Sequence, residues 1–194
     1  MQSATRRYLT TGLGAAAAIA ALLLLAAPAQ AGAPDDPPGW ERLASSRWRG
    51  LSIGYPPSVL RVVRPPADRP ASIVADVDRL VSEGGDLEVT LGADDTAVGS
   101  AGEYVRISLG SDRDTHRSVE VTYRARGATW EVASGLIDGK VFYYKAIDFC
   151  PPTNCGIPVV SSIKFTYAAG RKGEYDQLLE GMIRTVTPAT GRLE

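Results

Sequence analysis

Alternating hydrophobic and polar residues run through the second half of the chain and predict a series of β-strands. The clearest unit spans residues 128–148, where two β-branched and aromatic runs flank Asp138-Gly139. An Asp-Gly pair between such runs is typical of a two-residue β-hairpin loop. Alternation along both arms then assigns residues to one face of the sheet. The loop would set Trp130, Val132 and Leu136 opposite Ile147, Lys145 and Val141.

Four strands with short links are expected in this half and predict an antiparallel meander. They cover residues 119–124, 129–136, 140–147 and 159–167. A helix is predicted over residues 174–186, before Pro188, because apolar residues recur there at helical spacing and form one continuous stripe. That stripe, expected to pack on the sheet, consists of Tyr175, Leu178, Leu179, Met182, Ile183 and Val186.

The first half of the domain has a less regular pattern. Helical spacing of Trp40, Leu43, Ala44 and Trp48 predicts a short helix. Further strands are expected at 51–55, 73–81 and 87–91, one helical turn at 58–63, and a charged, solvated loop at 111–117. Two conformations stay open for residues 100–109. Ser100 and Glu103 have the spacing of a helix capping box, whereas Val105, Ile107 and Leu109 alternate as in a strand.

The first 31 residues have the pattern of a secretory signal peptide. Arg6 and Arg7 precede an apolar run at 12–27, and Ala29-Gln30-Ala31 follows as a cleavage pattern. The apolar run is shorter than the ~20 residues that span a bilayer, so we expect no membrane span after signal removal. The general secretory and twin-arginine routes both stay open. We expect a proline-rich lead-in at 32–39, one domain at 40–188, a tail at 189–194, and a periplasmic or secreted product.

The charge balance argues against nucleic acid as a partner. The chain has 21 Lys and Arg and 22 Asp and Glu residues, a net charge of −1. Binding to nucleic acid depends on clustered basic residues that neutralise phosphates, and the sequence has no basic block. We expect instead an unidentified protein or small-molecule partner in the cell envelope.

Three stretches resemble small exported bacterial proteins of unknown function that have a PsbP-like fold, named after an extrinsic subunit of the oxygen-evolving complex. They are GLSIGYP at 50–56 with Leu60, TYR at 122–124 followed by WEVASG at 130–135 and VFYYK at 141–145, and Tyr175-Asp176 before the last helix. The resemblance implies an antiparallel sheet covered by helices and brings no functional residue with it. We therefore expect a single α+β domain with a sheet of about six or seven strands, the C-terminal helix on one face, and N-terminal helical segments near an edge or the other face.

One motif suggests an enzyme. Residues 50–54 satisfy G-x-S-x-G, which in α/β-hydrolases lifts a nucleophilic serine out of a strand-to-helix turn. Ser52 instead falls within an alternating strand, and prolines follow it. The base would have to be His116, the only histidine, which the flanking charges make more typical of a plain loop residue.

Two further pairs have alternative interpretations. Cys150 and Cys155 have C-x4-C spacing, and in an exported chain they are expected to form a disulfide; a redox pair or half of a metal site are the alternatives. Asp76 and Asp78 share a strand face and could gather a hard cation such as calcium. An acidic solvent face is the simpler interpretation, and no metal or cofactor is expected.

A possible groove completes the candidates. Phe142, Tyr143 and Tyr144 could line one where the sheet is incompletely covered, although aromatic residues on a meander are mostly core. Taken together, these patterns favour an exported, non-enzymatic accessory or binding domain. The alternatives are a small secreted hydrolase using Ser52 and a purely structural envelope protein.

Overall fold

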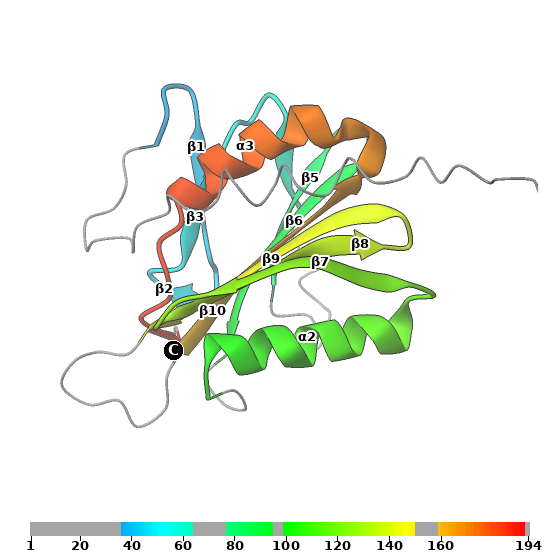
Figure 1. Cartoon of the computed structure of the whole chain (residues 1–194). Helices are drawn as coiled ribbons and strands as arrows, with labels where there is room; N and C mark the ends of the chain where they lie inside the picture. Colours follow the sequence, from blue (N-terminus) through cyan, green and yellow to red (C-terminus); the bar gives the residue numbers. More distant parts are fainter. Residues whose placement is uncertain (1–35, 64–76, 95–98, 150–158, 193–194) are drawn as a thin grey trace, which may run out of the picture.

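The computed structural model describes residues 36–63, 77–94, 99–149 and 159–192. Within these residues the centre of the fold is a seven-stranded antiparallel sheet in the order β4-β5-β6-β10-β9-β8-β7. Helix α2 (Ala101–Thr115) covers one face and α3 (Lys172–Arg184) covers part of the other (Figure 1). The expected α+β class, with an antiparallel sheet and a C-terminal helix, is confirmed.

The meander of the second half is as expected. Its strands are β7 (Val119–Arg126), β8 (Trp130–Ile137), β9 (Lys140–Phe149) and β10 (Val159–Ala168). Asp138 and Gly139 form the two-residue loop between β8 and β9 with φ values of 48° and 79°, both in the left-handed region that this turn requires. The register is the predicted one: Trp130 faces Ile147, Val132 faces Lys145 and Leu136 faces Val141.

Helix α3 begins two residues earlier than predicted, after a single 3-10 turn at Ala169–Arg171. Its predicted stripe packs on the sheet. Tyr175, Leu179, Met182 and Ile183 are buried, and Leu178 is partly buried against the same core. They share this core with the inward residues of β10, namely Ile163, Phe165 and Tyr167.

The segment left open, residues 100–109, is the first part of α2. Ser100 caps the helix by accepting a hydrogen bond from the Glu103 amide at 3.2 Å. The Glu103 carboxylate in turn accepts one from the Gly99 amide at 3.0 Å, so the capping-box spacing was the decisive signal. The alternating apolar residues do not share one face as they would in a strand, because Val105 and Leu109 are buried whereas Ile107 is 44% exposed.

The expectation of a solvated loop at 111–117 is wrong, because α2 continues to Thr115. Asp112 lies on the inward stripe of α2, eleven residues after Ala101, and is 8% exposed. Its carboxylate accepts hydrogen bonds from Tyr144 Oη at 2.9 Å and from Lys164 Nζ at 2.9 Å. A charged residue that gains such partners can occupy a core position, which the sequence pattern alone does not reveal.

The N-terminal helix predicted from the tryptophan spacing is also wrong. Residues Glu41–Ala44 form β1, which pairs antiparallel with β3 (Ser52–Tyr55), and Trp48–Arg49 form β2, which pairs with β11 (Gly191–Arg192). Strand pairing and burial of Leu43 and Trp48 override the helical period.

The remaining strands lie at the far edge of the sheet. Residues 58–63 were expected to form one helical turn. Leu60–Val63 instead form strand β4, which pairs with β5 (Asp78–Ser82). Strand β6 (Leu87–Asp94) extends the predicted 87–91 and lies between β5 and β10. In the part of the chain that the structure describes, no helix has both the length and the hydropathy needed to cross a membrane.

Candidate functional site

Ser52 takes part in a structural link at the N-terminal hairpin. It lies on β3 and is 8% exposed. Its hydroxyl accepts a hydrogen bond from the Arg42 guanidinium at 2.9 Å, and the same guanidinium bonds the Asp36 carboxylate at 2.9 Å and the Thr185 carbonyl at 3.1 Å. Ser52 thus helps to hold the β1–β3 hairpin to the end of α3.

The two glycines of the G-x-S-x-G pattern have local structural explanations. Gly50 has φ of 81° in the turn before β3, a conformation that glycine adopts readily. Gly54 lies where a Cβ atom would overlap the Asp36 carboxylate and approach Thr185 Oγ1 to 3.0 Å. The motif follows from a tight turn and a close approach, and it lacks the strand-to-helix turn that a nucleophile elbow requires.

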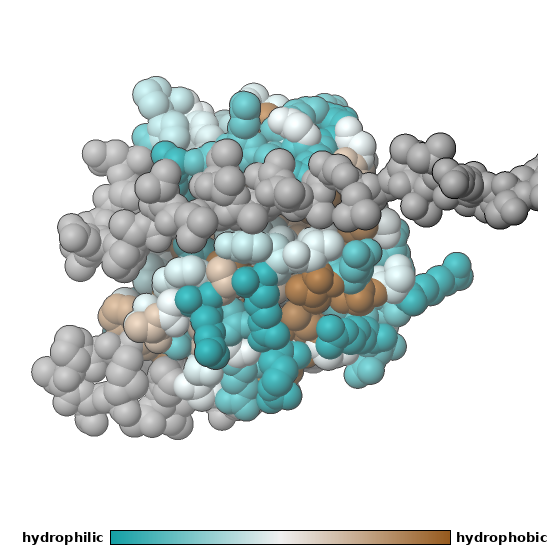
Figure 2. All heavy atoms as spheres, in the orientation of Figure 1, coloured by the Kyte–Doolittle hydropathy of each residue, from teal (hydrophilic) through white to brown (hydrophobic). Residues whose placement is uncertain are grey.

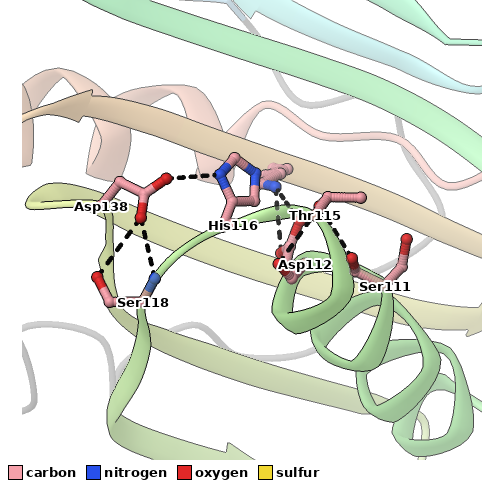
Figure 3. Close-up of polar contacts among 7 residues, drawn as sticks. Ser111, Asp112, Thr115, His116, Ser118 and Asp138 are labelled. Carbon is pink, nitrogen blue, oxygen red and sulfur yellow. Dashed lines mark hydrogen bonds and ion pairs between the residues drawn. The ribbon is translucent and has the colours of Figure 1, made fainter.

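His116 is paired with an acid at another place in the fold. It ends α2, and its Nδ1 lies 3.0 Å from Asp138 Oδ2, in the β8–β9 turn. The other oxygen of Asp138 accepts a hydrogen bond from the Ser118 amide at 3.0 Å (Figure 3). The hydrogen bond to His116, followed by that of the Ser118 amide, lowers the pKa of the Asp138 carboxyl.

The structure therefore brings His116 together with an acid but not with Ser52. The nearby Ser118 hydroxyl contacts Asp138 at 3.5 Å rather than the imidazole, and among the described residues neither Ser52 nor Ser118 bonds to His116. A serine nucleophile needs a base within hydrogen-bond reach, so these contacts do not form a catalytic pair. The His116–Asp138 hydrogen bond is a structural contact. It joins the end of α2 to the β8–β9 turn.

The metal and disulfide candidates fall mostly outside the described residues. Cys150, Cys155 and Asp76 all lie outside them. Asp78, on β5, accepts a long hydrogen bond from Ser46 Oγ at 3.4 Å. In the described ranges no group of three or more His, Cys, Asp or Glu side chains is placed to hold a metal ion.

The three aromatic residues proposed to line a groove are all buried and point to two sides of the sheet. Phe142 and Tyr144 pack under α2 with ring centroids 5.8 Å apart. Tyr143 lies on the α3 side, where its ring is 6.0 Å from that of Phe165. The three residues therefore do not line one surface. Tyr143 instead belongs to a row of hydroxyl groups that the prediction of an aromatic groove did not include.

A row of hydroxyl groups crosses β7, β8 and β9 on the α3 side of the sheet. The register places Tyr123 beside Ser134 and Ser134 beside Tyr143. Ser134 is fully buried, and its Oγ has no hydrogen-bond partner among the described residues. Burial, and then the nearby Tyr123, raise the pKa of the Tyr143 phenol. A buried hydroxyl without a partner is unfavourable. Among the described residues of the seven-stranded sheet, Ser134 Oγ and Asp148 Oδ1 are the two buried side-chain atoms in this situation.

Lys145 lies next to this row, two residues after Tyr143 on the same face of β9. Its cross-strand neighbours are Val132 and Ile163, which are 5% and 0% exposed. The lysine is itself partly exposed and, among the described residues, makes no hydrogen bond or ion pair. Burial lowers the pKa of its ammonium group. The signal was present in the sequence, because the hairpin pattern already placed this lysine on an apolar face.

The described helices and strands cover the surroundings of Lys145 incompletely. Helix α3 packs over β10 and β3, whereas α2 lies across β7 to β10 on the opposite side. Partly exposed apolar side chains lie along this face of β8 and β9. The Trp130–Ile147 pair is next to Lys145, and Leu136 lies further along β8, beyond the Ser134–Tyr143 pair. Figure 2, with β7 in the foreground, also shows hydrophobic atoms at the surface between the two helices. We call Tyr123, Trp130, Ser134, Leu136, Tyr143, Lys145 and Ile147 the lysine face.

Comparison of the chain with protein-family models and with curated protein sequences finds no match.

Proposed function

We propose that this protein is an exported, non-enzymatic binding domain that receives its ligand or partner on the lysine face. The observation that carries the proposal is the partly exposed apolar surface of Trp130 and Ile147 next to a lysine that has no partner among the described residues. Leu136 extends this apolar surface further along β8. Apolar surface with a few convergent polar groups is the usual composition of a ligand site.

Two features of the sequence complete the proposal. The signal-like first 31 residues support export to the periplasm or beyond. The resemblance to PsbP-like exported proteins supports a domain whose sheet and helices serve as a scaffold for binding. The α+β architecture, with α2 and α3 on opposite faces of an antiparallel sheet, is compatible with that relationship.

A neutral hydrophobic dye tests whether the lysine face binds ligands. Phenylnaphthylamine fluoresces strongly on entering an apolar site, so the wild-type protein should enhance its emission. The Leu136→Lys and Ile147→Lys variants should lose most of that enhancement. Ile107→Lys provides a matched control, because Ile107 is an exposed apolar residue on α2, on the other side of the sheet.

Equal loss in the Ile107→Lys control, or no loss in either variant of the lysine face, would contradict the proposal. The hydrolase alternative is tested separately with chromogenic esters and glycosides. Turnover that disappears in Ser52→Ala or His116→Ala would replace the binding function with an enzymatic one.

A further inference from the structure

We infer that the lysine face binds an amphipathic organic anion, with the single negative group on Lys145 and Tyr143 and the apolar body against Trp130 and Ile147. This inference rests on the proposed binding function and specifies the chemistry of its ligand. It adds a binding subsite and assigns a role to polar groups that have no partners among the described residues.

The position of Lys145 indicates an anion. The side chain rises from the middle of β9 with Tyr143 and Ile147 before and after it on the same face, and with Val132 and Ile163 on the flanking strands. None of these neighbours can neutralise an ammonium group. A charge held among apolar side chains is stabilised by a counter-ion and by charge-assisted hydrogen bonds. No described residue supplies them, and an anionic ligand would.

The hydroxyl row supplies further donors beside the ammonium group. The Tyr143 phenol makes no hydrogen bond to any described residue, and residues two apart on one strand have side chains on the same side, about 7 Å apart at their Cα atoms. A carboxylate or sulfonate between them could accept from both Nζ and Oη. The Ser134 hydroxyl, fully buried and without a partner in the described part of the chain, marks the polar base of this row.

The rest of the face sets the size and charge of the ligand. Lys145 is the only cationic side chain that the register of the described strands β7 to β9 puts on this face, and Glu120, opposite Leu136, adds a negative charge to it. A polyanion such as a nucleotide would lack partners there and would be repelled by Glu120. A molecule with one anionic group and an aromatic or aliphatic body fits both the lone lysine and the apolar surroundings.

Two dyes with the same body separate the anion subsite from the apolar surface. Anilinonaphthalene sulfonate carries one negative group, whereas phenylnaphthylamine has the same two aromatic parts without it. Titrations on the mature protein should give tighter binding of the sulfonate. Lys145→Met should weaken sulfonate binding by about tenfold or more, the value of one charge-assisted hydrogen bond, and leave phenylnaphthylamine binding unchanged.

Three further variants control for the fold and for charge alone. Lys145→Arg keeps the charge and should retain most of the sulfonate affinity. Tyr143→Phe should reduce that affinity about threefold to tenfold, as expected for one lost hydrogen bond. Lys140→Met removes an exposed lysine at the start of the same strand and should change neither dye. Thermal melting of each variant confirms that it is folded, and Lys145→Gln substitutes for Lys145→Met if the latter does not fold.

The outcomes separate this inference from the function on which it rests. If phenylnaphthylamine binding depends on Ile147 but the sulfonate gains nothing from Lys145, the anion subsite is wrong and the binding face stands. If neither dye depends on Ile147, both proposals fail. Competition by decanoate but not by decanol would extend the result to carboxylates, and equal competition by both would overturn the anion requirement.

Discussion

Replacing Lys145 with methionine should make the unliganded protein more stable. The ammonium group of this lysine lies among apolar neighbours and has no partner among the described residues. Methionine has a similar length, keeps the contacts of the aliphatic stem, and has no charge that must leave water. The substitution therefore removes an unfavourable term from the folded state without creating a large cavity.

The size of the gain follows from the burial of the side chain. An unpaired charge that is fully removed from water costs several kcal/mol, but Lys145 is partly exposed, so solvent screens much of that cost. We expect Lys145→Met to raise the free energy of unfolding by about 1–2 kcal/mol at neutral pH. Lys140→Met, at an exposed position of the same strand, should change it by less than about 0.5 kcal/mol.

The pH dependence of this gain identifies its cause. Burial lowers the pKa of Lys145 in the folded protein, so between that lowered value and the ordinary value of about 10.4 the unfolded chain binds more protons than the folded one. The stability of the wild type therefore rises with pH in this interval relative to the methionine variant. The advantage of Lys145→Met should be complete at neutral pH and should disappear as the pH approaches about 10.4.

Urea denaturation followed by tryptophan fluorescence, from pH 7 to about 10.5, measures both effects. A methionine variant that is less stable than the wild type at neutral pH would refute the reasoning, since it would mean that the lysine has a stabilising partner. A difference that stays constant or grows with pH would assign the effect to packing instead of charge.

Three other perturbations test the scaffold. Lys164→Met should destabilise the protein by roughly 2 kcal/mol because it leaves the Asp112 carboxylate buried with one donor fewer; a double-mutant cycle with Asp112→Leu that gives no coupling would contradict this. Gly135→Ala should cost roughly 1–3 kcal/mol, measured by urea denaturation, because a Cβ atom there would overlap a backbone carbonyl of β7. Asp86 has its pKa lowered chiefly by a hydrogen bond from Ser82, so its contribution is present above pH ~4 and is lost as the pH falls through the lowered value. The stability difference between the wild type and Asp86→Asn should therefore shrink in acid, and thermal melts from pH 6 to about 2.5 that show a constant difference would disagree.

The second half of the fold was predictable because its signals are local. The Asp-Gly turn sets the β8–β9 register through two residues, both with positive φ, and the apolar stripe of α3 repeats over three turns. In such segments the short-range preference and the final packing agree, so the pattern alone indicates the structure.

The first half was harder to predict because its structure depends on distant partners. The segment around Leu43 is held as a strand by its pairing with β3, and Trp48 by β11, which lies more than a hundred residues further along the chain. Asp112 is similar, since its inward position depends on donors from β9 and β10. Local spacing carries no information about such contacts, whereas the capping box of α2 involves only neighbouring residues and was visible in the sequence.

The candidate site was likewise predictable only where its signals are local. The hairpin pattern placed Lys145 on an apolar face, but only the register of three strands joins it to the hydroxyls of Tyr123, Ser134 and Tyr143. The motif-based candidates failed to converge because each is explained by its own surroundings. Ser52 bonds to Arg42, and His116 bonds to Asp138.

The contrast between two lysines on neighbouring strands is the strongest argument for a ligand. Lys164, on the α2 side of β10, reaches the Asp112 carboxylate at 2.9 Å and lies 4.8 Å above the Tyr144 ring. Lys145, on the opposite face of the sheet, lies between Val132 and Ile163 and has no such partner in the described structure. A scaffold that satisfies one lysine so fully could stabilise itself by replacing the other with an apolar residue. An ammonium group and a buried hydroxyl that have no partners among the described residues lower stability, and binding of an anion there would offset that cost.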